Sequence, residues 1–183
     1  MNWYARIAPF YNLICRPLYA QLRAAAVDAL QLSGSECVVE IGCGTGLNIA
    51  ALSKNSRQVI AVDCTAKMLD RAPQCFDNVE YVLGDSRAIA SDSADAVLLC
   101  QVLNVTDDWR SVLDDAKRIV KAGGRIVIAD VRPASGWLRF INGLAIPIAD
   151  WSGAGNHRRN IWQECEGVTL LHRGFFCVRR CEV

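Results

Sequence analysis

Short apolar runs alternate with amphipathic stretches along most of the chain. Runs rich in β-branched residues predict strands, and they lie at 37–41, 59–62, 79–83, 94–100 and 125–130. Helical spacing of apolar residues predicts helices at 17–30, 47–54, 66–71 and 108–121. The segment 137–149 is apolar, contains Pro147, and is expected to be helical in part. Run 94–100 is almost entirely apolar, which is typical of a strand buried on both faces.

Five strand–helix units in succession predict a parallel sheet with helices on both faces. Two later strand segments, 168–172 and 175–179, are joined by only a short connection at Gly174. No crossover helix fits there, so they should form an antiparallel hairpin at one edge of the sheet. The prediction is an α/β fold with a seven-stranded sheet, mostly parallel with an antiparallel last hairpin. A length of 183 residues suits a single domain, 1–183.

Composition narrows the classes of function. Lys plus Arg is 20 and Asp plus Glu is 19, a net charge of +1, which gives no reason to expect a nucleic-acid partner. No apolar run approaches the ~18 residues of a membrane span, and the first residues lack signal-peptide features. The nine cysteines include no CxxC pair, so we expect no metal site and reduced thiols in a cytoplasmic protein.

A glycine-rich turn follows the first predicted strand. Gly42, Gly44 and Gly46 stand at alternate positions, after Glu40 and before a predicted helix. Such a turn lets the main chain approach a ligand closely and points backbone N–H groups at it. The spacing differs from the Gly-x-Gly-x-x-Gly of dinucleotide-binding folds, which argues against a nicotinamide-dependent oxidoreductase. A tight turn without a ligand is the other interpretation.

Acidic residues follow the next two strands. Asp63 ends the second strand and Asp85, followed by Ser86, comes just after the third. A carboxylate in the first position can accept hydrogen bonds from ribose hydroxyls, and one in the second from the amine of a base. Ligands of open α/β sheets bind at the carboxyl ends of the strands, so these side chains should meet at one edge.

Taken together, the segments 40–46, 84–85 and 121–125 and the residue Asp63 resemble the ordered motifs of class I S-adenosylmethionine-dependent methyltransferases, which have a Rossmann-like fold. The resemblance implies S-adenosylmethionine as cofactor, with S-adenosylhomocysteine as its product. It also implies that the cofactor is bound by Glu40, Gly42, Cys43, Gly44, Gly46, Asp63, Cys64, Met68, Asp85, Ser86, Cys100 and Gln101.

Two groups within that superfamily are most similar. The segment 103–107 is similar to the quinone-biosynthesis C-methyltransferases of the ubiquinone/menaquinone type. The segment 4–12 and the tail from Phe140 resemble bacterial phosphatidylethanolamine N-methyltransferases. The resemblance therefore implies methyl transfer to a small molecule or a lipid head group, and leaves the acceptor atom and the oligomeric state open.

Methyl transfer from an activated sulfonium mainly needs a nucleophile held in line with it. If the acceptor needs a base, His157 is the candidate, and Arg158 and Arg159 could bind an acidic group of the acceptor. Residues 1–32 are interpreted as a helical lid within the domain, in which Tyr4 and Tyr11 touch the cofactor. The aromatic start of that segment also leaves peripheral membrane contact open. The alternative function is a non-catalytic module that binds the cofactor or a partner.

Overall fold

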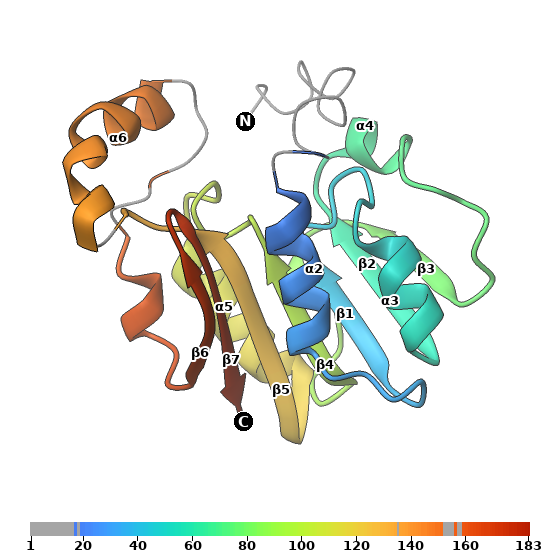
Figure 1. Cartoon of the computed structure of the whole chain (residues 1–183). Coiled ribbons are helices and arrows are strands. Elements are labelled where there is room, and N and C mark those ends of the chain that lie inside the picture. The colour runs from blue at the N-terminus through green and yellow to red at the C-terminus, as the bar shows by residue number, and fades with distance from the viewer. Residues whose placement is uncertain (1–16, 18, 135, 152–155, 157–158) are drawn as a thin grey trace.

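The computed structural model describes residues 17, 19–134, 136–151, 156 and 159–183 (Figure 1). Its strands are β1 (Cys37–Ile41), β2 (Gln58–Asp63), β3 (Val79–Leu83), β4 (Ala94–Cys100), β5 (Val120–Val131), β6 (Val168–Arg173) and β7 (Phe176–Glu182). The α-helices are α2 (Ala20–Ala29), α3 (Ile49–Asn55), α4 (Ala66–Leu69), α5 (Trp109–Ile119) and α6 (Asn142–Trp151). Short 3-10 turns form η1 (Ser86–Ala88), η2 (Gly136–Ile141) and η3 (Ile161–Gln163).

The strands form one seven-stranded sheet in the order β3-β2-β1-β4-β5-β7-β6. Neighbours from β3 to β5 are parallel, whereas β7 runs antiparallel to both β5 and β6. The predicted mixed sheet with its last hairpin is therefore confirmed. The chain order reverses between β1 and β4, so the loops that follow these two strands diverge and leave space for a ligand.

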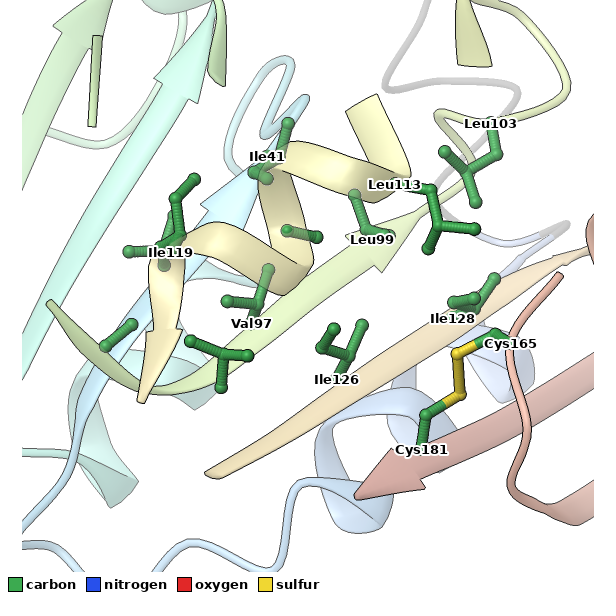
Figure 2. Close-up of a cluster of buried hydrophobic side chains, with 14 of the residues drawn as sticks. Ile41, Val97, Leu99, Leu103, Leu113, Ile119, Ile126, Ile128, Cys165 and Cys181 are labelled. Carbon is green, nitrogen blue, oxygen red and sulfur yellow. A yellow bond between two sulfur atoms is a disulfide. The ribbon is translucent and has the colours of Figure 1, made fainter. Parts of the chain in front are cut away.

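Two apolar layers flank the sheet. On one face α5 packs Leu113, Ala116 and Ile119 against side chains of β1, β4 and β5, as Figure 2 shows. On the other face α2 and α3 cover alternate residues of the same strands, among them Val38 and Leu98 (Figure 1). Because side chains of a strand alternate between faces, central strands with a layer on each side are apolar throughout. Helices on both faces are thus confirmed.

Strand β5 starts earlier than the sequence predicts. The glycine pair 123–124 was expected to separate helix from strand, yet β5 begins at Val120, directly after α5. Val120 pairs with Ala94, and the main chain of Gly123 and Gly124 exchanges hydrogen bonds with Val183 at the chain's end. Both glycines stay within the strand because the backbone of Val183 accepts a hydrogen bond from Gly123 and donates one to Gly124.

One pair of cysteines contradicts the expectation of reduced thiols throughout. Cys165, after η3, and Cys181, in β7, form a disulfide and are 3% and 2% exposed (Figure 2). The loop from η3 to β6 folds back over the sheet and brings the two Cα atoms to 6.3 Å, within disulfide range. The other cysteines of the described residues are free. None of the described helices is long and apolar enough to span a membrane.

Candidate functional site

A pocket of about 170 Å³ opens at the carboxyl ends of β1, β2 and β4, where the strand order reverses. Eight of the residues that were predicted to bind a cofactor line it: Gly42, Gly44, Asp63, Cys64, Met68, Asp85, Ser86 and Gln101. The loops after four different strands therefore meet at one place, as the rule for open α/β sheets requires.

The glycine-rich turn forms the floor of this pocket. Gly42, Gly44 and Gly46 all have positive φ angles, of 74°, 56° and 73°, which side chains disfavour. A Cβ on Gly42 would lie 2.6 Å from a methyl group of Val102, and one on Gly46 would lie 2.8 Å from Pro73. Gly42 and Gly44 line the pocket. Gly46 does not, and its missing side chain lets the turn pack closely against Pro73.

Asp63 joins the end of β2 to the glycine turn. Its carboxylate accepts hydrogen bonds from the backbone N–H groups of Gly44 and Thr65, each at 2.8 Å. Burial raises the pKa of Asp63, and the two backbone hydrogen bonds oppose that rise. Each carboxylate oxygen has a further lone pair. The same side chain can therefore shape the turn and accept from a ligand's hydroxyl groups.

Glu40 is buried beneath the turn, in the middle of the sheet, and is only 1% exposed. Its Oε1 accepts a hydrogen bond of 2.6 Å from Asn48 Nδ2, whereas Oε2 accepts none from any described residue. Burial raises the pKa of Glu40 to about 7, and the neighbouring Asp63 adds to the rise. A buried carboxylate oxygen without a donor is unfavourable, and a cationic group such as an α-ammonium would satisfy it.

The part of the pocket that follows β2 and β3 is lined by Cys64, Met68, Asp85 and Ser86. Asp85 accepts hydrogen bonds from the backbone N–H and the Nε of Arg87, both at 3.0 Å, and Arg87 holds the pKa of this exposed carboxyl below its usual value. The hydroxyl of Ser86 donates to Asp115 at 2.6 Å, so this side chain is committed to α5. Ser86 lines the pocket while its hydroxyl is used in this bond.

The loop after β4 adds residues that were not predicted to lie in the cofactor site. Val102, Val105 and Thr106 line the pocket with Gln101, a non-glycine residue with a positive φ of 59°. Backbone strain of this kind persists where the surroundings hold it, and it clusters at ligand sites. Val105 and Thr106 belong to the segment 103–107, which was singled out for its resemblance, but only the fold shows that this loop is a wall of the pocket.

Two predicted cysteines lie outside the pocket. Cys43 and Cys100 are 6% and 7% exposed and pack in the apolar layer beneath α2 and α3. Burial raises the pKa of both thiols above the ordinary value. Neither is among the residues that line the pocket. Both residues therefore stabilise the layer under the glycine turn and the end of β4.

A buried polar pair fixes the loop after β4. Asn104 and Asp130, at the end of β5, are 2% and 3% exposed, and Asn104 Nδ2 donates to Asp130 Oδ1 at 2.8 Å. Burial raises the pKa of Asp130 to about 6. Arg159 directs Nη1 to the carbonyl oxygens of Leu103, at 2.6 Å, and of Thr106. The arginine predicted to bind an acceptor thus also holds the pocket loop.

Four predicted site residues, Tyr4, Tyr11, His157 and Arg158, lie outside the described residues, as does most of the predicted lid 1–32. Within the part of the chain that the structure describes, no three His, Cys, Asp or Glu residues gather as a metal ion would require.

Comparison with known proteins finds similarity to methyltransferases. A family model described as a methyltransferase domain matches residues 39–128. The demethylmenaquinone methyltransferase of Clavibacter sepedonicus is 34% identical over 113 residues, which are 59% of this chain and 46% of that protein. The chain spans between 34% and 56% of the length of the first curated relatives that it matches.

Solved structures share the fold. The DhpI–SAH complex has a TM-score of 0.67 at 20% identity, covering 98% of this chain and 92% of that one. Phosphoethanolamine N-methyltransferase 1 of Haemonchus contortus, in complex with phosphoethanolamine and S-adenosylhomocysteine, has a TM-score of 0.62 at 20% identity, covering 71% of this chain and 31% of that one. At such identities the likeness concerns the fold alone.

Proposed function

We propose that the chain is a class I S-adenosylmethionine-dependent methyltransferase that transfers a methyl group to a small molecule or a lipid head group, a proposal supported by the methyltransferase-domain match and the methyltransferase relatives. The supporting observation is the unsatisfied, buried Oε2 of Glu40 beside a glycine turn that Asp63 holds in shape. This combination suits a ligand that has both an ammonium group and a ribose, as S-adenosylmethionine does.

In this proposal Glu40, which lies behind the pocket lining, and the residues of the pocket divide the cofactor between them. Glu40 Oε2 binds the α-ammonium group, and the alternate glycines allow the amino-acid part to approach the main chain. Asp63 accepts from the ribose hydroxyls through the free lone pairs of its oxygens. Cys64 and Met68 flank the adenine, and Asp85 with the main chain of Ser86 binds its edge.

The bound cofactor supplies an activated sulfonium methyl group, so the protein's contribution is to align the acceptor and exclude water. Gln101 and the loop after β4 lie where that methyl group is expected, at the end of the central strand. In the proposal His157 accepts a proton if the acceptor must lose one. Arg158 and Arg159 bind an anionic group, since a guanidinium has five N–H donors and Arg159 uses only Nη1 on the pocket loop.

Helix α2 belongs to the apolar layer on the sheet, which contradicts a lid role for that part of the segment 1–32. The stretch before α2, which contains Tyr4 and Tyr11, is proposed to close over the pocket against the cofactor. A cytoplasmic location is proposed as well, and the free state of six described cysteines is consistent with a reducing compartment, although the one disulfide is unusual there.

Peripheral membrane contact, left open above for the start of the chain, is also proposed at η2 and α6. Phe140 and Leu144, four residues apart, are 73% and 71% exposed. No acidic residue occurs between 131 and 149, whereas Arg132 and Arg139 do, so this surface suits an anionic bilayer. The Phe140→Ser/Leu144→Ser protein should lose flotation with vesicles of phosphatidylcholine and phosphatidylglycerol. Val168→Ser, which alters an apolar residue of another surface that is 61% exposed, should not.

The alternative is a module that binds the cofactor without transferring its methyl group. Incubation with methyl-labelled S-adenosylmethionine and a panel of amines, phenols, quinols and phospholipids separates the two. Label in one acceptor class supports the enzyme and names its substrate. Cofactor binding without any labelled product supports the module.

A further inference from the structure

The loop formed by residues 101–106 makes one wall of the pocket and touches its floor. A Cβ placed on Gly42 would meet the Val102 side chain at 2.6 Å, so this valine packs directly on the glycine turn. Val105 and Thr106 line the same wall, and Gln101 has a positive φ. A shift of this loop therefore changes the shape of the proposed cofactor site.

The loop has little internal structure to hold it. Its only internal main-chain bonds among the described residues run from the N–H groups of Val105 and Thr106 to the carbonyl of Val102, at 3.2 and 3.0 Å. One turn of this kind is not stable by itself, because its ordering entropy exceeds the gain from so few hydrogen bonds. Its position must come from contacts with the rest of the chain.

An inner anchor ties the loop to β5. Asn104 donates from its backbone N–H to Asp130 Oδ2 at 3.2 Å and from Nδ2 to Asp130 Oδ1 at 2.8 Å. Nδ2 also donates to the carbonyl of Val131 at 2.6 Å. Both side chains are buried, so these bonds are protected from water.

An outer anchor comes from more than fifty residues further along the chain. Arg159 Nη1 donates to the carbonyls of Leu103 and Thr106, separated from it by 56 and 53 positions. The backbone N–H of Asn156 donates to the carbonyl of Asn104 at 2.8 Å. The positive charge of Arg159 also lowers the pKa of Asp130, against the effect of burial, so the two anchors interact.

We infer that Arg159 is a positioning residue that couples the segment expected to bind the acceptor to the wall of the cofactor pocket. The inference rests on the proposed cofactor site. Because coupling between two binding sites is reciprocal, a molecule that draws Arg159 away from the loop weakens cofactor binding, and bound cofactor in turn favours the docked segment.

Arg179 provides a matched control. Its Nη1 also donates to two backbone carbonyls, those of Trp162 and Cys165, and its side chain is half-buried like that of Arg159. None of its recorded hydrogen bonds reaches the loop 101–106. Replacing either arginine by alanine removes hydrogen bonds from a guanidinium to two backbone carbonyls. Only the bonds of Arg159 hold the loop that lines the pocket.

The experiment measures S-adenosylhomocysteine affinity by calorimetry for the full chain and for Arg159→Ala and Arg179→Ala. We expect a roughly tenfold loss of affinity for Arg159→Ala and less than a twofold change for Arg179→Ala, with a lower Tm in both. Hydrogen exchange at the amides of Val105 and Thr106 should accelerate in Arg159→Ala alone. If Arg159→Ala does not fold, Arg159→Lys should show the same changes at smaller amplitude.

Equal affinities for the two alanine variants, or unchanged exchange at Val105 and Thr106 in Arg159→Ala, overturn the inference and leave the cofactor assignment intact. Failure of the unmodified chain to bind S-adenosylhomocysteine overturns the cofactor site itself, and the inference with it.

Discussion

Glu40→Gln should stabilise the protein while weakening its cofactor site. The substitution keeps the volume of the side chain. It also keeps one oxygen, which can accept the hydrogen bond that Asn48 Nδ2 donates to Glu40 Oε1 at 2.6 Å in the wild type. It removes a charge that is 1% exposed and whose second oxygen has no donor among the described residues. Burial raises the pKa of Glu40 and outweighs the positive charge of Arg23, which lowers it, so the ionised wild-type residue is unfavourable in the empty fold.

The size of the effect follows from the pKa of Glu40, which burial raises from 4.5 to about 7. Since the folded pKa lies above the unfolded one, the folded state binds more protons between these values, and stability falls as pH rises through that window. At about 1.4 kcal/mol for each pH unit between the two pKa values, the loss approaches about 3 kcal/mol by pH 8.

Denaturant unfolding of the ligand-free protein at pH 4.5 and pH 8 measures this difference. Glu40→Gln should be more stable than the wild type by up to about 3 kcal/mol at pH 8 and similar at pH 4.5. Asp130, whose pKa is raised to about 6, contributes a pH dependence of the same sign to both proteins, and it cancels in the comparison.

Calorimetry with S-adenosylhomocysteine completes the test. Wild-type affinity should rise between pH 5.5 and 7.5, because an ammonium favours ionised Glu40 and binding then releases a proton. Glu40→Gln should bind roughly ten- to a hundredfold more weakly at pH 8, and at pH 6, where the wild type releases a proton on binding, the variant should release none. A variant that is less stable at pH 8 and binds with unchanged affinity would refute the reasoning.

Three further predictions concern the pocket and the disulfide. Asp63→Ala should weaken S-adenosylhomocysteine binding roughly a hundredfold in a calorimetric titration, because two charge-assisted contacts and the anchor of the glycine turn are lost; a change within twofold contradicts its role. S-adenosylhomocysteine should slow alkylation of exposed Cys64, which lines the pocket, and leave that of exposed Cys75 unchanged by mass spectrometry; equal rates would count against the adenine assignment. Replacing Cys165 and Cys181 by serine should lower the free energy of unfolding by about 3 kcal/mol, since the bond closes a loop of 16 residues; unaltered denaturant midpoints would contradict this.

The fold was predictable because its signals are local. Strands 37–41, 79–83 and 94–100 are found as predicted, since each is a short apolar run bounded by polar or turn-forming residues. Alternation with helices then specifies a parallel sheet, which brings Asp63 and Asp85 to one edge. That part of the site follows from topology alone.

The rest depends on contacts between distant segments. Arg159 donates hydrogen bonds to the loop carbonyls of Leu103 and Thr106, more than fifty residues away in the sequence. No sequence pattern in either segment predicts this contact. Disulfide pairing among nine cysteines cannot be deduced from spacing, which is why the bond from Cys165 was missed.

Cys43 and Cys100 were expected to bind the cofactor, but both are buried in the apolar layer under α2 and α3. Cys100 lies within β4 and shares a face with Ala96 and Leu98, as the alternation of side chains along a strand requires.

Methyl transfer by this chain is tested most directly by following the methyl group from the cofactor to its acceptor. The full chain should be incubated with methyl-labelled S-adenosylmethionine and extract from the cells that produce it, and the labelled product identified by mass spectrometry. We expect one labelled small molecule or lipid, formed together with S-adenosylhomocysteine. The Asp63→Ala protein should form no labelled product. Tight cofactor binding by the unmodified chain without any labelled product would contradict the proposed methyl transfer.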